Sequence, residues 1–150
     1  MPLADLSAEG FAATLYWYGA NIHPAAEEKK RREALASLAA GRVPVFVEDT
    51  FTPPWMEAAS PLAEEPEGGR RCALCFRLQL EGAARAAVRE GIPLLCTTLT
   101  ISPHKDASLI NAIGEETVRA FGLRWLSRIF RKQNGFVRSV AMSKELGLYR

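Results

Sequence analysis

Short apolar runs alternate along this chain with longer stretches in which apolar residues recur every three or four positions. Apolar runs bounded by glycine or proline are typical of buried strands, and the longer periodic stretches are typical of amphipathic helices. The pattern predicts strands at residues 11–18, 43–47, 93–98 and 124–130. It predicts helices at residues 3–9, 24–40, 72–90, 108–121 and 135–146.

This alternation predicts a single α/β domain over residues 1–150, built as three layers around a mainly parallel sheet. Ligands of such folds bind beyond the carboxyl ends of the strands. The loops expected to meet there are residues 18–24, 48–72 and 98–106, followed by the region 130–135. Within the longest of these loops, Phe51, Trp55 and Met56 indicate that the segment packs onto the domain and includes a short helix.

A pair of cysteines stands out in the stretch 64–76, EEPEGGRRCALCF. Cys72 and Cys75 are three residues apart at a predicted helix start, so they share one face, and the helix N-terminus favours thiolate. Arg70 and Arg71 add positive charge. Two such thiols can bind a soft metal or an iron–sulfur cluster, exchange as a redox pair, or remain reduced in a helix. As a metal site the pair is incomplete, because such sites usually have four ligands.

Other polar residues follow the third predicted strand. His104, at the exit of that strand, is a candidate proton donor, metal ligand or phosphate contact, with an ordinary surface histidine as the alternative. His23 is a similar but weaker candidate. Cys96 lies in an apolar strand and is predicted to be a core residue. Hydroxyl groups suited to phosphate or ribose gather at the strand end, at Thr97, Thr98, Thr100 and Ser102.

Charge is unevenly distributed, although the net charge is only +2. Residues 1–118 hold 11 Lys/Arg and 16 Asp/Glu, whereas residues 119–150 hold 8 Lys/Arg and one Glu, with aromatic residues interleaved. A basic, aromatic segment is either a nucleic-acid footprint or a solvated helix face. No apolar run is long enough for a membrane span, and the first residues do not resemble a secretion signal. We therefore expect a cytosolic protein without a membrane partner.

Six motifs and Trp55 then identify a family. The motifs are NIHP (21–24), EPEGGRRCALCF (65–76), TTLTISPHK (97–105), INAIG (110–114), FRKQNGF (130–136) and SKELGLYR (143–150). In this order they closely resemble the QueH-type epoxyqueuosine reductases. The resemblance extends from about Leu15 to Arg150.

The resemblance implies reduction of epoxyqueuosine to queuosine at the wobble position of tRNA, with an electron donor that the sequence does not identify. It also implies an α/β, Rossmann-like fold related to the adenine nucleotide α-hydrolases. A 4Fe–4S cluster would be held by Cys72 and Cys75 together with a Cys-Cys pair. We infer from the chemistry that His104 supplies a proton. The substrate pocket would be lined by Asn21, His23, Thr98, Ser102, Lys105, Arg131 and Lys132.

The chain also departs from the family pattern. The Cys-Cys pair is expected shortly before Met1, and a redox-active Cys-Gly-Cys shortly after Arg150, so the chain is expected to be a fragment. Ile129 stands where an acidic residue is expected, and Gln79 where an arginine is expected. A Gly-Ala pair replaces the usual Asn-Pro before Asn21. The change at Ile129 could alter a site beside the cluster.

Two interpretations from other functional classes remain open. The first is a thioredoxin-like dithiol/disulfide oxidoreductase that uses Cys72 and Cys75, although here the thiols follow two predicted strands and a long loop. The second is a non-catalytic module in which the cysteines of two copies hold one zinc ion.

Overall fold

The computed structural model describes residues 2–48 and 54–149 of the chain. Helices account for more of the described residues than strands do. In chain order the elements are α1 (Pro2–Ala8), β1 (Leu15–Trp17), α2 (Ala25–Ala39), β2 (Val45–Val47), α3 (Pro54–Ala59), the 3-10 helix η1 (Ser60–Leu62), α4 (Arg70–Arg89), β3 (Leu94–Leu95), the 3-10 helix η2 (Thr98–Ile101), α5 (Ala107–Phe121), β4 (Arg124–Trp125) and α6 (Gly135–Glu145).

The strands form two parallel pairs. β1 pairs with β2, and β3 pairs with β4. The prediction of a mixed α/β fold with parallel strands is therefore confirmed. The described residues, however, show two separate two-stranded sheets in place of the one continuous sheet that was expected.

All four predicted strands are shorter in the structure, and at two of them side chains hydrogen-bond to backbone groups near the end of the predicted range. The predicted strand 93–98 ends at Leu95, and the hydroxyl of Thr97 then accepts the N–H of Leu99 at 3.2 Å, which starts η2. In the predicted strand 124–130, the Arg128 carbonyl accepts the Asn111 side-chain amide at 3.3 Å. Local side-chain hydrogen bonds of this kind compete with sheet pairing.

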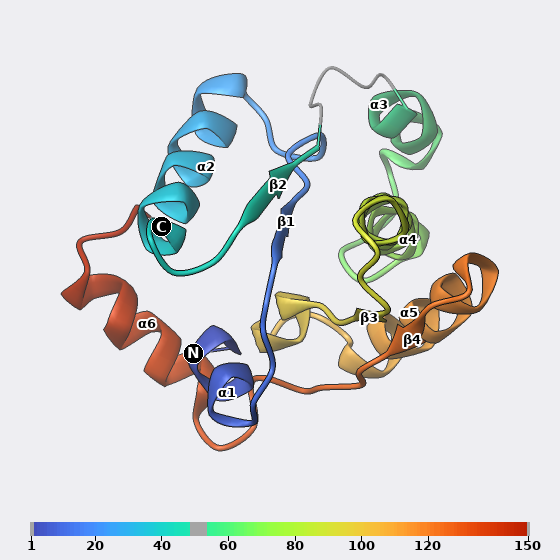
Figure 1. The fold of residues 1–150 in the computed structure, drawn as a ribbon. Helices are drawn as coiled ribbons and strands as arrows, with labels where there is room; N and C mark the ends of the chain where they lie inside the picture. Colours follow the sequence, from blue (N-terminus) through green and yellow to red (C-terminus); the bar gives the residue numbers. More distant parts are fainter. Residues whose placement is uncertain (1, 49–53, 150) are drawn as a thin grey trace.

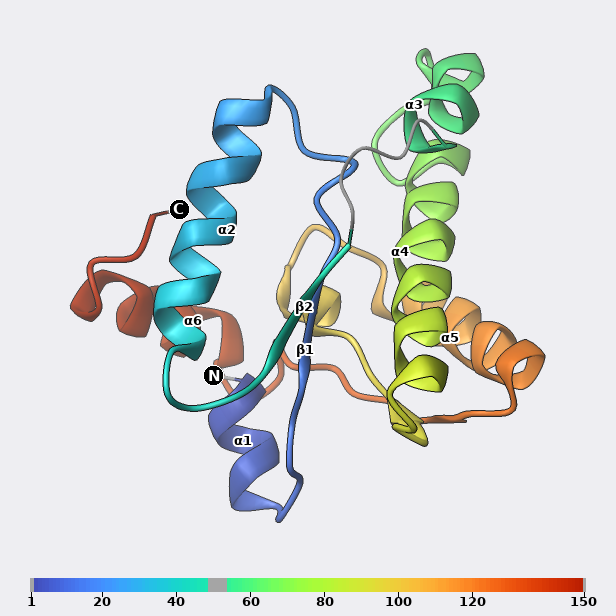
Figure 2. The ribbon, with the colours of Figure 1, turned by 45° about the horizontal axis from the view of Figure 1, so that its top comes forward.

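The molecule divides into two regions around the strand pairs, as Figures 1 and 2 show from two directions. We call one the β1–β2 region, which contains α1, α2 and α6. We call the other the β3–β4 region, which contains α3, α4 and α5. Helix α6 follows β4 in the sequence but lies with α1 and α2 (Figure 1). The chain therefore returns to its starting side after β4.

An apolar core joins α4 to α5 in the β3–β4 region. Its buried residues are Phe76, Leu80, Ile110 and Ile113, and Ile110 has no exposed surface. On α4 the buried face also includes Ala83, Ala84 and Ala87, whereas Val88 is 51% exposed.

The indole of Trp125 lies so close to Gly114 of α5 that a Cβ atom there would overlap the ring. Its Nε1 donates to Asn111 Oδ1 at 2.9 Å. The absence of a side chain at Gly114 is therefore what allows β4 to pack tightly on α5.

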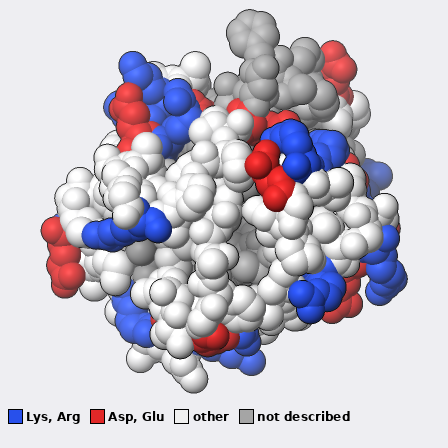
Figure 3. All heavy atoms as spheres, viewed as in Figure 1, with Lys and Arg blue, Asp and Glu red and all other residues white. Residues whose placement is uncertain are grey.

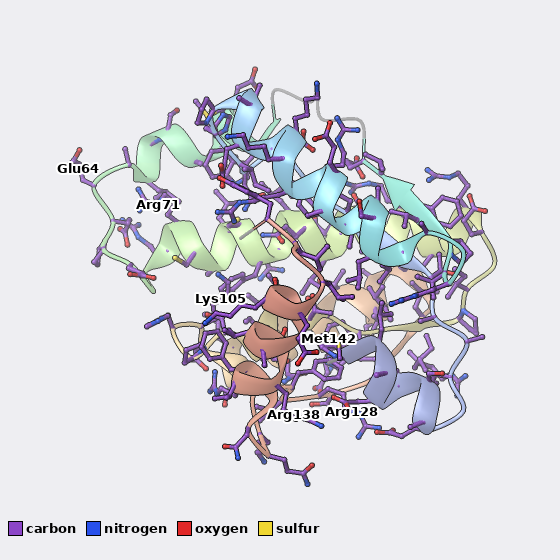
Figure 4. All side chains as sticks on the ribbon, turned by 90° about the vertical axis from the view of Figure 1, so that its left-hand side faces the viewer. Glu64, Arg71, Lys105, Arg128, Arg138 and Met142 are labelled. Atoms are coloured by element: carbon purple, nitrogen blue, oxygen red, sulfur yellow. The ribbon has the colours of Figure 1, made fainter. Side chains whose placement is uncertain are left out.

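Polar contacts dominate the β1–β2 region. Trp17 of β1 donates its Nε1–H to the carboxylate of Glu28 on α2 at 2.7 Å, and Glu28 is buried. Arg32 also donates to Glu28, at 3.1 Å. Ion pairs of Arg128 with Glu9 and of Arg138 with Asp5 hold α1 to the segments that follow β4. Both arginines appear beside α1 and α6 in Figure 4.

The long loop is only partly described. Its predicted short helix is confirmed as α3, where Trp55 is half-buried and Met56 is 54% exposed. The predicted packing of Phe51 lies outside the described residues. Among the described helices none has both the length and the apolar character needed to cross a membrane. The cytosolic location stays a prediction.

Candidate functional site

A tight turn presents the first residues of α4. The Glu65 carboxylate accepts the backbone N–H of Arg70 at 3.0 Å and its side-chain Nε–H at 2.7 Å. These hydrogen bonds lower the pKa of the Glu65 carboxyl, because they favour its charged form. A Cβ at Gly69 would lie 2.7 Å from the Glu65 carboxylate and 3.0 Å from the Pro66 carbonyl oxygen, so a larger residue would disturb these contacts.

The two arginines that precede the cysteines help to hold this turn. Arg70 forms the ion pair with Glu65, and Arg71 donates from Nη1 to the Ala63 carbonyl at 2.7 Å. Figure 4 shows Arg71 at the N-terminal end of α4, with Glu64 on the preceding turn. The arginines therefore act first on the shape of the turn, in addition to the charge effect predicted from the sequence.

The cysteine sulfurs both accept N–H groups. Cys72 Sγ accepts the backbone N–H of Gly68 at 3.3 Å. Cys75 Sγ accepts Nδ2–H of Asn21 at 3.3 Å and Nε2–H of Gln79 at 3.1 Å. Both cysteines are half-buried and free of disulfide bonds. N–H groups directed at sulfur are also the outer contacts that metal-binding thiolates usually have.

A cavity of about 430 Å³ lies against the two cysteines. Its wall is built by the end of β1 with the loop after it, the turn before α4, the first turns of α4, and the loop between η2 and α5. Three of the loops predicted to meet, 18–24, 48–72 and 98–106, therefore meet here. Five predicted site residues come together in the cavity wall: Asn21, Cys72, Cys75, His104 and Lys105.

The other predicted site residues lie outside this wall. His23 is exposed and its ring lies 5.5 Å from that of Trp55. Thr98 is exposed at the start of η2, and Lys132 is exposed after β4. The Ser102 hydroxyl accepts the backbone N–H of His104 at 3.3 Å, which shapes the His104 loop. The binding roles of these residues stay predictions.

Arg131 contacts the loop that carries His104. Its Nη1 donates to the carbonyls of Ser102 at 3.0 Å and Lys105 at 2.7 Å. These two carbonyls flank His104, so one guanidinium sets the path of the loop that carries both His104 and Lys105. A single guanidinium nitrogen thus links the backbone on both sides of His104.

Tyr18 is a cavity residue that the sequence reasoning missed. Burial, the larger cause, and the negative charge of Cys75 together raise the pKa of Tyr18 to about 12, and Arg85 opposes them. The hydroxyl is therefore a neutral hydrogen-bond donor beside Cys75 at physiological pH. Its position at the carboxyl end of the strand 11–18 was the signal that could have identified it.

The described residues do not form a metal site by themselves. Across residues 2–48 and 54–149, no group of three or more His, Cys, Asp or Glu could hold a metal ion. Cys96 does not line the cavity; it is half-buried, and burial raises the pKa of its thiol. Any metal centre here therefore needs ligands in addition to Cys72 and Cys75.

The chain is similar to proteins of one family along nearly its whole length. The family model described as epoxyqueuosine reductase QueH matches residues 1–150. An epoxyqueuosine reductase QueH of Streptococcus pyogenes is 35% identical over 144 residues, which cover 91% of this chain and 56% of that protein. The protein of the same name from Staphylococcus epidermidis is 32% identical and covered to 61%, and that from Thermotoga maritima is 32% identical and covered to 74%.

The chain thus spans about 56% to 61% of the length of the streptococcal and staphylococcal relatives. Its own residues are matched to 91% or more by each of these relatives. The thiol pair, the cavity beside it and these matches agree with the family expected from the motifs. The chain belongs to the QueH family of epoxyqueuosine reductases.

Proposed function

We propose that this chain is part of an epoxyqueuosine reductase that acts at the wobble position of tRNA, and that it contributes two cysteine ligands and the wall of the substrate pocket. The observation that carries the proposal is the pair Cys72 and Cys75, with N–H donors on both sulfurs, beside a cavity in a chain of this family.

The two cysteines fit half of a 4Fe–4S site. Thiolates are the usual ligands of such clusters, and N–H groups directed at the sulfurs are the usual outer contacts. When bound, the cluster would supply electrons to the reaction. The remaining ligands would come from outside the described residues, as the incomplete set of metal ligands requires.

The overall reaction needs two electrons and two protons. The carbon–oxygen bonds of the epoxide break, a carbon–carbon double bond forms, and the oxygen leaves as water. Epoxyqueuosine is thereby reduced, and an electron donor, still to be identified, is oxidised.

His104 is the proposed proton donor. It is exposed at the cavity wall, on the loop shaped by Ser102 and Arg131. A histidine changes its charge near neutral pH, which suits proton transfer. Tyr18 offers an O–H donor at the same cavity, which would orient the substrate oxygen.

We propose that fewer basic residues bind tRNA phosphates than the number of Lys and Arg in residues 119–150 would suggest. Arg128 and Arg138 are paired with carboxylates, and Arg131 is hydrogen-bonded to the loop before α5. On the face in Figure 3, Lys and Arg alternate with Asp and Glu around a mainly uncharged centre. We therefore assign phosphate contacts to Lys105 at the cavity and to Lys132, which is exposed.

The proposal also concerns how the two strand pairs are joined. We propose that the two strand pairs are parts of one parallel sheet of the type found in adenine nucleotide α-hydrolases, with a further strand between β1 and β3. The N–H of Leu15 and the carbonyl of Trp17 bond to the β2 side, so the backbone groups of Tyr16 face the opposite edge. On β3, the backbone groups of Leu94 face away from β4 in the same way.

Anaerobic cluster reconstitution of the full-length protein tests the cofactor. We expect a brown protein with iron and sulfide, and loss of iron in Cys72→Ser and Cys75→Ser but not in the control Cys96→Ser. A colourless, iron-free wild-type protein with a reversible Cys72–Cys75 disulfide would overturn the proposal and support the thioredoxin-like alternative. A zinc content of half an ion per chain would support the dimeric module.

Two further measurements test the tRNA contacts and the sheet. Lys132→Met should weaken tRNA binding and reduce the slope of affinity against salt by about one. An unchanged slope would remove Lys132 from the footprint. Amide hydrogen exchange should show Tyr16 and Leu94 as protected in the full-length protein, and rapid exchange there would contradict the single sheet.

A further inference from the structure

Two side chains from different parts of the fold donate hydrogen bonds to the sulfur of Cys75. Asn21 comes from the loop after β1, in the β1–β2 region, and Gln79 comes from α4 itself. Gln79 is four residues after Cys75, so the helix places the two on one face. Asn21 is 54 residues away in the sequence, and only the fold brings it to the sulfur.

The two carboxamides can only stabilise Cys75 by donating. A sulfur with negative charge accepts hydrogen bonds, and each amide nitrogen points its N–H at it. The Asn21 oxygen is buried and has no hydrogen-bond partner among the described residues. Rotation of this amide would place that oxygen against the sulfur, which is repulsive, so the sulfur determines its orientation.

Cys72 differs from Cys75 in the source of its donor. Its hydrogen bond comes from the backbone N–H of Gly68, so no side chain controls it. The electronic environment of Cys75 is instead controlled by side chains, and single substitutions can change it.

We propose that Asn21 and Gln79 are positioning residues that hold the Cys75 sulfur and raise the reduction potential of the cluster bound through it. This inference rests on the proposed function. N–H groups directed at a cluster sulfur withdraw negative charge and favour the reduced form, which is the more negative one. Removing either donor therefore lowers the potential.

A potentiometric titration of the reconstituted full-length protein, followed by electron paramagnetic resonance, tests this inference. Gln79→Met and Asn21→Leu keep approximate side-chain size but remove the donor. We expect each to change the equilibrium ratio of oxidised to reduced cluster about tenfold, which is a decrease of about 59 mV for one electron. Gln79→Arg retains N–H donors and should have a potential at or above that of the wild type.

Arg89→Met is the matched control, since Arg89 is exposed at the far end of the same helix. It should leave the potential unchanged. If Gln79→Met loses iron while Gln79→Arg and Arg89→Met retain it, the role of Gln79 in holding the sulfur is supported. A full iron content with an unchanged potential in both Gln79→Met and Asn21→Leu overturns the inference, whereas a wild-type protein that binds no cluster overturns the proposed function.

Discussion

The β3–β4 region and the β1–β2 region are stabilised by different kinds of contact. In the first, α4 and α5 share an apolar core around Ile110. In the second, a buried carboxylate, Glu28, links α2 to β1, and exposed ion pairs link α1 to the segments after β4. Salt screens exposed ion pairs, whereas apolar burial does not depend on that screening.

The candidate site lies where these regions meet. Cys72 and Cys75 sit on the helix with the better-packed core, whereas Asn21 and Tyr18 reach the cavity from the more polar region. The cysteines therefore lie on a helix with a packed core, whereas one of their hydrogen-bond donors, Asn21, depends on how the two regions pack together. Substitutions in the two regions should therefore differ in their effects on stability.

Ile110→Ala should have the largest effect. Ile110 is fully buried between α4 and α5, and removing its side chain should lower the free energy of unfolding by about 2–5 kcal/mol. Urea unfolding followed by circular dichroism measures this. Leu35→Ala, at a half-buried position of α2, is the matched control and should cost much less. Equal losses would mean that both regions have comparable apolar cores.

Glu28→Leu should have the next largest effect. It leaves the Trp17 N–H without its acceptor and Arg32 without its ion pair, which should lower the free energy of unfolding by about 1–3 kcal/mol. Glu28→Gln keeps an acceptor of the same size and should lose less. If Glu28→Leu were as stable as the wild type, the polar link between α2 and β1 would have no energetic importance.

Tyr18 should show a measurable pH effect. Its pKa is raised from 10.0 to about 12, so the folded form binds the proton more tightly than the unfolded form. Its contribution to stability is therefore complete below pH 10 and falls as the pH rises toward 12. Ultraviolet titration of wild type and Tyr18→Phe isolates this phenol. Titration of Tyr18 near its ordinary value would show that the cavity is open to water at that point.

The ion pair of Arg128 and Glu9 should have the smallest effect. Both side chains are partly exposed, so a double-mutant cycle with Arg128→Met and Glu9→Gln should give about 0.2–1 kcal/mol, decreasing with salt. The pair of Arg77 and Glu116, within the β3–β4 region, is the comparison. A coupling that persists at high salt would show that α1 is held more firmly than surface charges allow.

Local patterns predicted much of the fold and part of the site. Phe76, Leu80 and Ala84 of α4 are spaced four residues apart and share the buried face of the helix. Such a face can be predicted from the sequence, because the helical period is a local property. The same holds for the position of Cys72 and Cys75 in the first turns of that helix. Strand lengths could not be predicted in this way, since side chains such as Thr97 and Asn111 compete for backbone groups that a strand would use.

The chain pattern was enough to find the thiol pair, its place at the start of a helix and the family. Packing of separate elements brought Asn21 to the sulfur of Cys75, Tyr18 to the cavity and Arg131 to the His104 loop. A helix or a turn depends on residues that are neighbours in the chain, whereas the Asn21–Cys75 and Arg131–Ser102 contacts join residues 54 and 29 positions apart. Such contacts depend on how whole elements pack.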